Sequence, residues 1–294
     1  MTSRASVDSL QAAYRHCRGI TRREARNFYY AFITLPHRRR QAVYATYAFS
    51  RLVDDIADGA GTEDEKAQAL ADVRVRLREA CSGAPDGPIF LALADTAQAF
   101  GIPESLFHDI LDGVEMDLWV QRYESYEDLR EYCCKVASAV GLVSIYVFGY
   151  RGEAAKEYAV DFGLAMQITN ILRDLREDME RGRVYLPQDE MRRFGYTEEH
   201  LQAGVIDDNF LALMQFQVER ARSYFRSGAR LLPLLETRSR PCAAGLHQLY
   251  SRLLDRIEAR GFDVFSSRVS LSACEKLQLT GKLWATSFIP QRPR

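Results

Sequence analysis

Two groups of acidic side chains, each at the end of a predicted helix, have the spacing expected of a site for metal-bound phosphate. In a helix predicted over residues 38–58, Tyr47, Arg51, Asp54 and Asp58 follow one another at spacings of 4, 3 and 4. Residues three and four apart share one helix face, so this face changes from aromatic to basic to acidic along its length. Neighbouring carboxylates repel each other unless a cation lies between them, and Mg²⁺ combines carboxylates with phosphate oxygens and water. Taken alone, the pattern is equally typical of a solvated acidic helix end.

A second polar face lies on a helix predicted over residues 160–180. Gln167, Asn170, Asp174 and Asp178 recur there at spacings of 3, 4 and 4, although the first half of this helix is otherwise apolar. Burying polar groups without partners costs about 1–3 kcal/mol each. A row of them on a core helix therefore indicates a polar cavity inside a helical bundle. The alternative is a buried hydrogen-bond network with no ligand.

The composition is that of a helical protein with a full apolar core. Of the 294 residues 47% are hydrophobic and 27% are charged, and the chain has only 9 prolines and 18 glycines, few for a loop-rich β protein. Its 39 basic residues are balanced by 40 acidic residues. This balance argues against a protein that binds nucleic acid, because such proteins usually carry a basic excess.

Capping residues, glycine and proline mark the expected helix boundaries. Gly101 is expected to end one helix and Pro103 to open the next, while Ser125 and Asp207 are typical helix starts. Between such boundaries lie roughly eight to ten helical stretches, with no alternating strand pattern, repeat or linker. We predict one all-α domain over residues 1–294.

The cysteines and the apolar stretches indicate the cellular setting. The six cysteines contain no Cys-x-x-Cys pair, so zinc-ligand spacing is absent and a reducing, cytoplasmic location is expected. The most apolar run, residues 136–150, is shorter than the about 20 residues that cross a bilayer, and we predict a buried helix there. We expect a monomer or a weak homodimer. Peripheral contact of the basic run at residues 37–40 with an acidic membrane surface stays open.

Four parts of the chain resemble the squalene/phytoene synthase family, and we expect the match to run from about residue 14 to about residue 285. The two longest contain the acidic groups described above. The matching segments are residues 28–36 with 44–58, 132–141, 167–178 with 182–187, and 261–268.

This resemblance implies an isoprenoid synthase helical bundle with a central cavity, capped at one end by two Asp-rich helices. It also implies a Mg²⁺-dependent, head-to-head condensation of two identical prenyl diphosphates. One allylic diphosphate ionises, the C2–C3 double bond of the second molecule attacks the cation, and a cyclopropylcarbinyl diphosphate forms. Metal ions and arginines lower the barrier because the charge on the diphosphate grows as its C–O bond breaks.

The resemblance also implies roles for individual residues. Ligands of Mg²⁺ are expected at Asp54, Asp58, Asn170, Asp174 and Asp178. Catalytic residues are expected at Arg51, Tyr47, Tyr132 and Arg173. Substrate contacts are expected from Phe28, Phe32, Arg51, Gln167, Asn170, Arg183, Tyr185 and Arg268.

Three positions depart from the family pattern. The family commonly has Ser or Thr near positions 25 and 27, where this chain has Ala25 and Asn27. A hydroxyl contact to diphosphate in this segment is therefore altered, with Asn27 as a substitute donor. Ser138 replaces a common glycine, and the sequence offers no interpretation of that change.

Three other functions are weighed against this one. A head-to-tail prenyltransferase shares the Asp-Asp-x-x-Asp pattern that ends at Asp58, but it should repeat that pattern where this chain has Asn-x-x-Arg-Asp-x-x-x-Asp. A terpene cyclase should end the second polar face in Glu instead of Asp178. A non-catalytic assembly factor with the same fold would be expected to lose the acids, and all are present.

The motifs leave the product open between farnesyl and geranylgeranyl diphosphate as donor. The segments at residues 136–141 and 261–265 look closer to bacterial squalene-pathway enzymes. We therefore predict farnesyl diphosphate as the donor and a C30 product of the presqualene type, with phytoene synthesis from geranylgeranyl diphosphate as the alternative. NADPH is required only if the product is squalene, and the chain has no Gly-x-Gly-x-x-Gly fingerprint of a dinucleotide fold.

Overall fold

The computed structural model describes residues 4–25, 28–272, 275 and 278. These residues form helices and loops, with two isolated β-bridges and no strand, so the predicted all-α fold is confirmed. Asn27 and Cys274 lie outside the described residues. The helices are α1 (Arg4–Glu24), α2 (Phe28–Phe32), α3 (His37–Ala57), α4 (Glu63–Cys81), α5 (Pro88–Phe100), α6 (Glu104–Trp119), α7 (Tyr126–Cys133), the π-helical turn η1 (Cys134–Ser138), α8 (Ala139–Phe148), α9 (Ala154–Glu180), α10 (Gln188–Arg193), α11 (Glu198–Gln202), α12 (Asp208–Gly228), the 3₁₀ turn η2 (Ala229–Leu234) and α13 (Arg240–Ala259).

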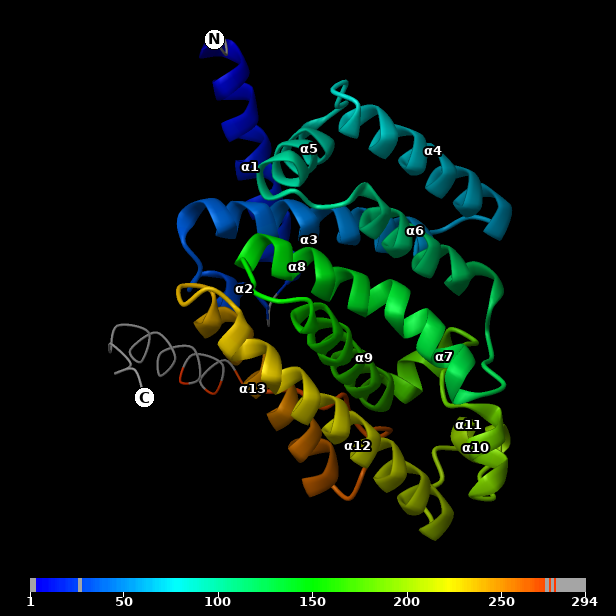
Figure 1. Ribbon diagram of the computed structural model, residues 1–294. Helices are drawn as coiled ribbons and strands as arrows, with labels where there is room; N and C mark the ends of the chain where they lie inside the picture. The colour runs from blue at the N-terminus through cyan, green and yellow to red at the C-terminus, as the bar shows by residue number, and fades with distance from the viewer. Residues whose placement is uncertain (1–3, 26–27, 273–274, 276–277, 279–294) are drawn as a thin grey trace, which may run out of the picture.

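The two helices with acidic ends, α3 and α9, are each surrounded by their own set of neighbours. Helix α3 packs against α1, α4, α5 and α6, which lie in the upper half of Figure 1. Helix α9 packs against η1 and against α12 and α13, which lie in the lower half. Helix α8 contacts both α3 and α9. Because α3 and α9 share no extensive packing with each other, their polar faces are free to line a space between them.

Most predicted boundaries agree with the structure. Ser125 and Asp128 form a capping box at α7, Asp207 caps α12, and Gly101 ends α5 with a φ of 63°. The helix predicted from residue 160 begins at Ala154, because its first turns are partly polar and escape an apolar pattern. The structure also has more helices than the roughly eight to ten predicted, since α2, α10 and α11 have only five or six residues and show no clear periodicity.

The apolar run predicted as a short buried helix belongs to a longer one. Residues Tyr126–Phe148 form a continuous helical stretch of 23 residues, which is long and apolar enough to cross a membrane by those two criteria alone. The prediction that it is too short was wrong, because its first two turns are polar and did not count toward the apolar run. The stretch packs against α6 and α9, as the core helix of a bundle does.

The π-helical turn within this stretch fits closely between two glycines. A Cβ at Gly113 would lie 2.7 Å from Val136 Cγ1, and a Cβ at Gly163 would lie 2.6 Å from the Cα of Ser138. The hydroxyl of Ser138, a departure from the family pattern, donates a hydrogen bond of 2.9 Å to the Val160 carbonyl. Ser138 thus links the turn to α9, the helix that carries the second polar face.

Replacing Gly163 is expected to destabilise the fold. In Gly163→Ala the new methyl group meets backbone atoms that cannot rotate away, so we expect a loss of about 2 kcal/mol and a melting temperature lower by roughly 4–8 °C. Gly19→Ala is the matched control, since Gly19 also lies inside a helix and nothing lies within 4 Å of its added Cβ. That change should stabilise by roughly 0.5–1 kcal/mol. Thermal unfolding of both variants measures the difference, and equal melting temperatures would contradict the close packing.

Candidate active site

A cavity of about 290 Å³ lies between the acidic ends of α3 and α9; we call it the first cavity. Its wall is mostly polar and contains all five predicted Mg²⁺ ligands. The residues that line it are Asp54, Ala57, Asp58, Val114, Asp117, Tyr132, Gln167, Asn170, Ile171, Arg173, Asp174, Asp178, Arg181, Arg183 and Tyr185. Two acidic segments more than 100 residues apart in sequence thus face one space.

Helix α3 contributes Asp54 and Asp58. The side chain of Asp54 is half-buried and makes no hydrogen bond or ion pair with any residue that the structure describes. Burial raises the pKa of Asp54 to about 7, against an ordinary value of 3.8, although the nearby charge of Arg51 opposes this shift. Asp58, just after the last turn, is instead ion-paired with Arg181 at 3.2 Å and Arg183 at 3.6 Å.

Helix α9 contributes three predicted ligands with different surroundings. The amide nitrogen of Asn170 donates to Gln167 Oε1 at 3.3 Å, while its oxygen is buried without a partner in the described structure. Burial, with the adjacent Asp174 carboxylate, raises the pKa of Asp178 to about 7. An unpaired amide oxygen and a carboxylate that resists ionisation both favour the presence of a cation.

Asp174 is neutralised by two arginines. Arg173 Nε donates to Asp174 Oδ1 at 2.7 Å, and Arg268 donates to both carboxylate oxygens at 3.0 and 3.1 Å. Arg268 lies on the segment after α13, which crosses this end of α9 and is tied to it by Arg176, whose guanidinium donates to the Phe265 carbonyl at 2.8 Å. Any metal ion that binds Asp174 would therefore compete with two guanidinium groups.

A second cavity of about 650 Å³ adjoins the first, because Asp54, Asn170 and Arg173 line both. Its remaining wall combines aromatic, aliphatic and basic side chains. They are Glu24, Ala25, Phe28, Tyr47, Arg51, Leu249, Tyr250, Leu253, Arg268, Val269, Ser270 and Leu271. A polar space thus continues into a larger and more apolar one.

Of the two phenylalanines expected to contact substrate, Phe28 lines the second cavity and Phe32 is set back from it. The rings of Phe28 and Tyr47 lie 6.4 Å apart, and Tyr250 lies 5.9 Å from Phe28. Phe32 lines neither cavity: it is buried behind Phe28, with ring centroids 6.0 Å apart, and meets Tyr44 edge-on. Phe32 therefore supports the wall through Phe28.

The loop after α9 brings two predicted substrate contacts to the end of α6. Val184 pairs with Arg122 in a parallel bridge, and its backbone N–H donates to the Gln121 carbonyl at 2.9 Å. This pairing places Arg183 and Tyr185 in the wall of the first cavity.

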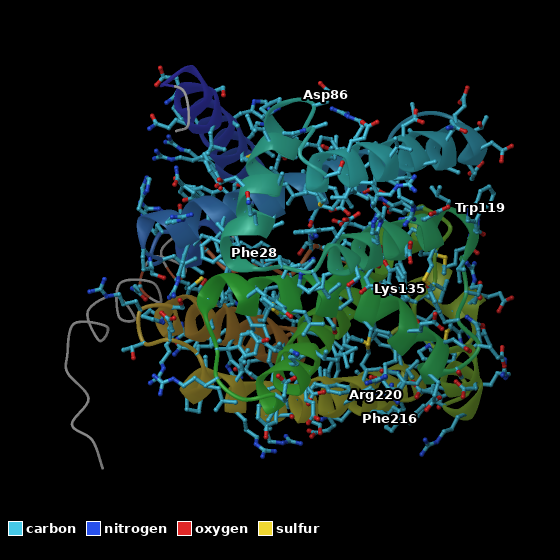
Figure 2. All side chains as sticks on the ribbon, turned by 45° about the horizontal axis from the view of Figure 1, so that its top comes forward. Phe28, Asp86, Trp119, Lys135, Phe216 and Arg220 are labelled. Carbon is cyan, nitrogen blue, oxygen red and sulfur yellow. The ribbon has the colours of Figure 1, made fainter. Side chains whose placement is uncertain are left out.

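Trp119, at the end of α6, is 56% exposed and lies at the edge of the molecule in Figure 2.

Sequence reasoning missed several residues that line this site, and three of them contact predicted site residues. Asp117 accepts hydrogen bonds from the Tyr185 hydroxyl at 2.7 Å and the Tyr132 hydroxyl at 3.0 Å. Arg181 reaches Asp58 from just beyond α9, and Tyr250 comes from α13. The basic cluster around Gly182 was a usable signal for Arg181, but Asp117 and Tyr250 belong to no polar pattern along their helices.

The donor set fits Mg²⁺ only together with a substrate. Within residues 4–25 and 28–272, no three carboxylate, histidine or cysteine side chains are gathered closely enough to hold a metal ion. Magnesium usually takes one or two carboxylates and completes its shell with phosphate oxygens and water. Unpaired Asp54 and Asp178 and the free amide oxygen of Asn170 are suitable oxygen donors.

Magnesium binding is expected to weaken by roughly 10- to 100-fold from pH 8 to pH 6. The metal needs ionised carboxylates, and the pKa values of Asp54 and Asp178 near 7 mean that both take up protons over this range. Both pKa values lie above 3.8, the ordinary value of an Asp carboxyl, so the fold favours the protonated form of each group. The ligand-free protein is therefore also expected to lose stability as pH rises through 7 and the two groups ionise. Calorimetric titration with Mg²⁺ and an unreactive diphosphate, in two buffers of different ionisation enthalpy, measures the released protons. Binding that is the same at both pH values would contradict this expectation.

With the geometry known, comparison with known proteins decides the family. The family model described as squalene/phytoene synthase matches residues 21–275. This chain belongs to the squalene/phytoene synthase family. The match is somewhat shorter at both ends than the predicted range of about 14–285.

Individual members of the squalene/phytoene synthase family agree with this assignment. The 15-cis-phytoene synthase of Synechococcus elongatus is 39% identical over 285 residues, which cover 92% of this chain and 92% of that protein. The phytoene synthase of Mycobacterium bovis is 37% identical over 284 residues, covering 96% and 93%. The crystal structure of a dehydrosqualene synthase in complex with ligand has a TM-score of 0.88 at 29% identity, covering 96% of this chain and 98% of that one.

As a squalene/phytoene synthase-type enzyme, the chain is a prenyltransferase that condenses prenyl diphosphates head to head. The predicted isoprenoid synthase fold is confirmed. The head-to-tail, cyclase and non-catalytic alternatives lose their support, because the family match spans both acidic helices.

Proposed function

We propose that this chain is a phytoene synthase, which condenses two molecules of geranylgeranyl diphosphate. The observation that carries the proposal is identity over nearly the whole chain: two phytoene synthases share 37–39%, whereas the dehydrosqualene synthase shares 29%. This supports the alternative over the farnesyl diphosphate that the short motifs favoured. The choice of donor depends on the walls of the whole cavity, and two short segments sample little of them.

In this proposal the diphosphate lies in the first cavity and the prenyl chains extend into the second. Asp54, Asp58, Asn170, Asp174 and Asp178 would hold Mg²⁺, which neutralises charge on the departing diphosphate. The arginines in the two cavity walls bind the remaining diphosphate oxygens, because the planar guanidinium matches them in pairs. They are Arg51, Arg173, Arg181, Arg183 and Arg268.

The second cavity suits the allylic cation. Rings of Phe28, Tyr47 and Tyr250 line it, and the negative faces of aromatic rings attract positive charge without donating electrons covalently. Leu249 and Leu253 are apolar neighbours that keep water from the cation. Arginine at the junction and aromatic rings beyond it therefore separate the two charges that form when the C–O bond breaks.

Product analysis tests the proposal. The enzyme is incubated with Mg²⁺ and either geranylgeranyl or farnesyl diphosphate, with and without NADPH, and the products are identified by mass spectrometry. We expect phytoene from geranylgeranyl diphosphate, with no dependence on NADPH and a rate at least about tenfold above that with farnesyl diphosphate. A C30 product formed preferentially from farnesyl diphosphate would overturn the choice of donor and leave the family reaction in place.

A further inference from the structure

The carboxylate of Asp117 lines the first cavity but has no role in the proposed function. Both oxygens of Asp117 are engaged: Oδ1 accepts from the Tyr185 hydroxyl at 2.7 Å, and Oδ2 accepts from the Tyr132 hydroxyl at 3.0 Å. The two tyrosine rings are stacked, with centroids 5.2 Å apart and planes 22° apart. Asp117, Tyr132 and Tyr185 all line the cavity.

The hydrogen atoms in this arrangement can be counted. A phenol has one O–H donor, and an ionised carboxylate only accepts. The Tyr185 hydroxyl donates to Asp117, and the Tyr132 hydroxyl donates to Asp117 at 3.0 Å and lies 3.4 Å from the Tyr185 oxygen, its longer partner. Neither tyrosine therefore has a donor left for a substrate. Their oxygens retain lone pairs, so both side chains can meet a bound substrate only as acceptors and as ring faces.

We propose that Asp117 is a positioning residue that holds Tyr132 and Tyr185 as an acceptor wall of the first cavity, which offers the departing diphosphate no hydrogen-bond donor on that side. The arginines of the site then remain the partners of the diphosphate. This inference rests on the ionisation step of the proposed function, but not on the length of the prenyl chain.

Asp117 works through the groups around it. Burial and the Asp58 carboxylate raise the pKa of Asp117, while Arg183 and the two tyrosine hydroxyls favour its ionised form. A third ring, Tyr123, is stacked 5.9 Å from Tyr185. The side chain sits on the last turns of α6, while the two tyrosines come from α7 and the loop after α9. One carboxylate therefore fixes groups from three separate segments in one geometry.

Asp117→Asn separates this role from simple packing. The amide has the same shape but accepts through one oxygen only, so one tyrosine regains a free donor that faces the substrate. We expect kcat for diphosphate release to fall about 10- to 100-fold, with KM and the Mg²⁺ requirement changed less than about threefold. Asp95→Asn is the matched control, because Asp95 accepts a hydrogen bond of 2.6 Å from Tyr14 between α1 and α5, away from both cavities. It should leave kcat unchanged.

A variant that keeps Asp117 but removes both tyrosine hydroxyls tests the proposal independently. Tyr132→Phe combined with Tyr185→Phe retains both rings and removes both hydroxyls, so it should lower kcat by a similar factor. Adding Asp117→Asn to it should then cost less than about threefold, because the carboxylate has nothing left to position. In protein labelled at tyrosine Cζ, the signals of Tyr132 and Tyr185 should shift in Asp117→Asn, and those of the twelve tyrosines other than Tyr123, which stacks on Tyr185, should not.

Several results would overturn the proposal. The first is an unchanged kcat in either Asp117→Asn or the double phenylalanine variant. The second is a loss of kcat in the combined variant that equals the product of the two separate losses. The third is a Mg²⁺ requirement raised more than about tenfold in Asp117→Asn, which would make Asp117 a metal ligand. If Asp117→Asn does not fold, the double phenylalanine variant decides alone. All variants are assayed with whichever prenyl diphosphate the enzyme turns over, so an incorrect choice of donor does not affect the outcome.

Discussion

Asp54→Asn and Asp174→Asn are each expected to lower diphosphate release by at least about 10³-fold while leaving the helical content unchanged. Both carboxylates line the first cavity, one from each acidic helix. In the proposed function both are needed to hold the diphosphate between α3 and α9. Release of diphosphate in the presence of Mg²⁺ and far-ultraviolet circular dichroism measure the two quantities. Asp72→Asn, an exposed change on α4, is the control and should retain full activity.

The same two variants should differ in stability. Asp54 is unpaired in the described structure, and the ionised form of a carboxylate with a pKa of about 7 is unfavourable in the fold, so Asp54→Asn should raise the melting temperature at pH 8. Asp174→Asn leaves Arg173 without its carboxylate and Arg268 with only the longer ion pair to Glu177 at 3.5 Å, so it should lower the melting temperature. Retained Mg²⁺-dependent turnover in either variant would show that the site is elsewhere.

Arg173→Gln is expected to lower kcat by about 10²- to 10³-fold. The side chain of Arg173 is 11% exposed, lines both cavities and donates to Asp174, so it lies where the diphosphate and the prenyl chain meet. Its charge matters most as the C–O bond breaks, and the loss should therefore appear in kcat more than in KM. Arg51→Lys should cost less, about tenfold, because lysine retains the charge and loses only the paired contact.

The control for Arg173→Gln is the same substitution at an exposed arginine that lines neither cavity. Arg226→Gln on α12 changes the net charge by the same amount and should have no effect on kcat. Separate measurement of kcat and KM for the three variants distinguishes the roles. An Arg173→Gln enzyme with normal kcat and a raised KM would mean that this arginine binds the substrate without stabilising the departing diphosphate.

The two acidic faces could be predicted from the sequence because helix geometry alone brings residues three and four apart together. Asp54 and Asp58, and likewise Gln167, Asn170, Asp174 and Asp178, needed only a correct helix assignment. The repetition of an acidic polar face on two otherwise apolar helices favoured one shared site, and the family resemblance placed both helices at one end of the bundle, since no local pattern encodes the distance between α3 and α9. The segment containing Arg183 and Tyr185 also depended on the resemblance.

Asp117 shows what a local pattern cannot provide. Helix α6 contains five acidic residues among sixteen, and nothing in their spacing separates Asp117 from the other four. Its function depends on Tyr132 and Tyr185, which approach from other segments. Phe32 illustrates the converse, because the resemblance implied substrate contacts from both Phe28 and Phe32, and packing leaves Phe32 behind Phe28.

The most direct test of the central claim is to locate a bound metal ion and diphosphate. Crystals grown with Mn²⁺ and an unreactive thiolo analogue of the prenyl diphosphate would reveal the ions by anomalous scattering. The account predicts ions in the first cavity, coordinated from α3 by Asp54 or Asp58 and from α9 by Asn170, Asp174 or Asp178, with the diphosphate between the two helices. Ions bound elsewhere, or a diphosphate held with only one of the two helices, would contradict it.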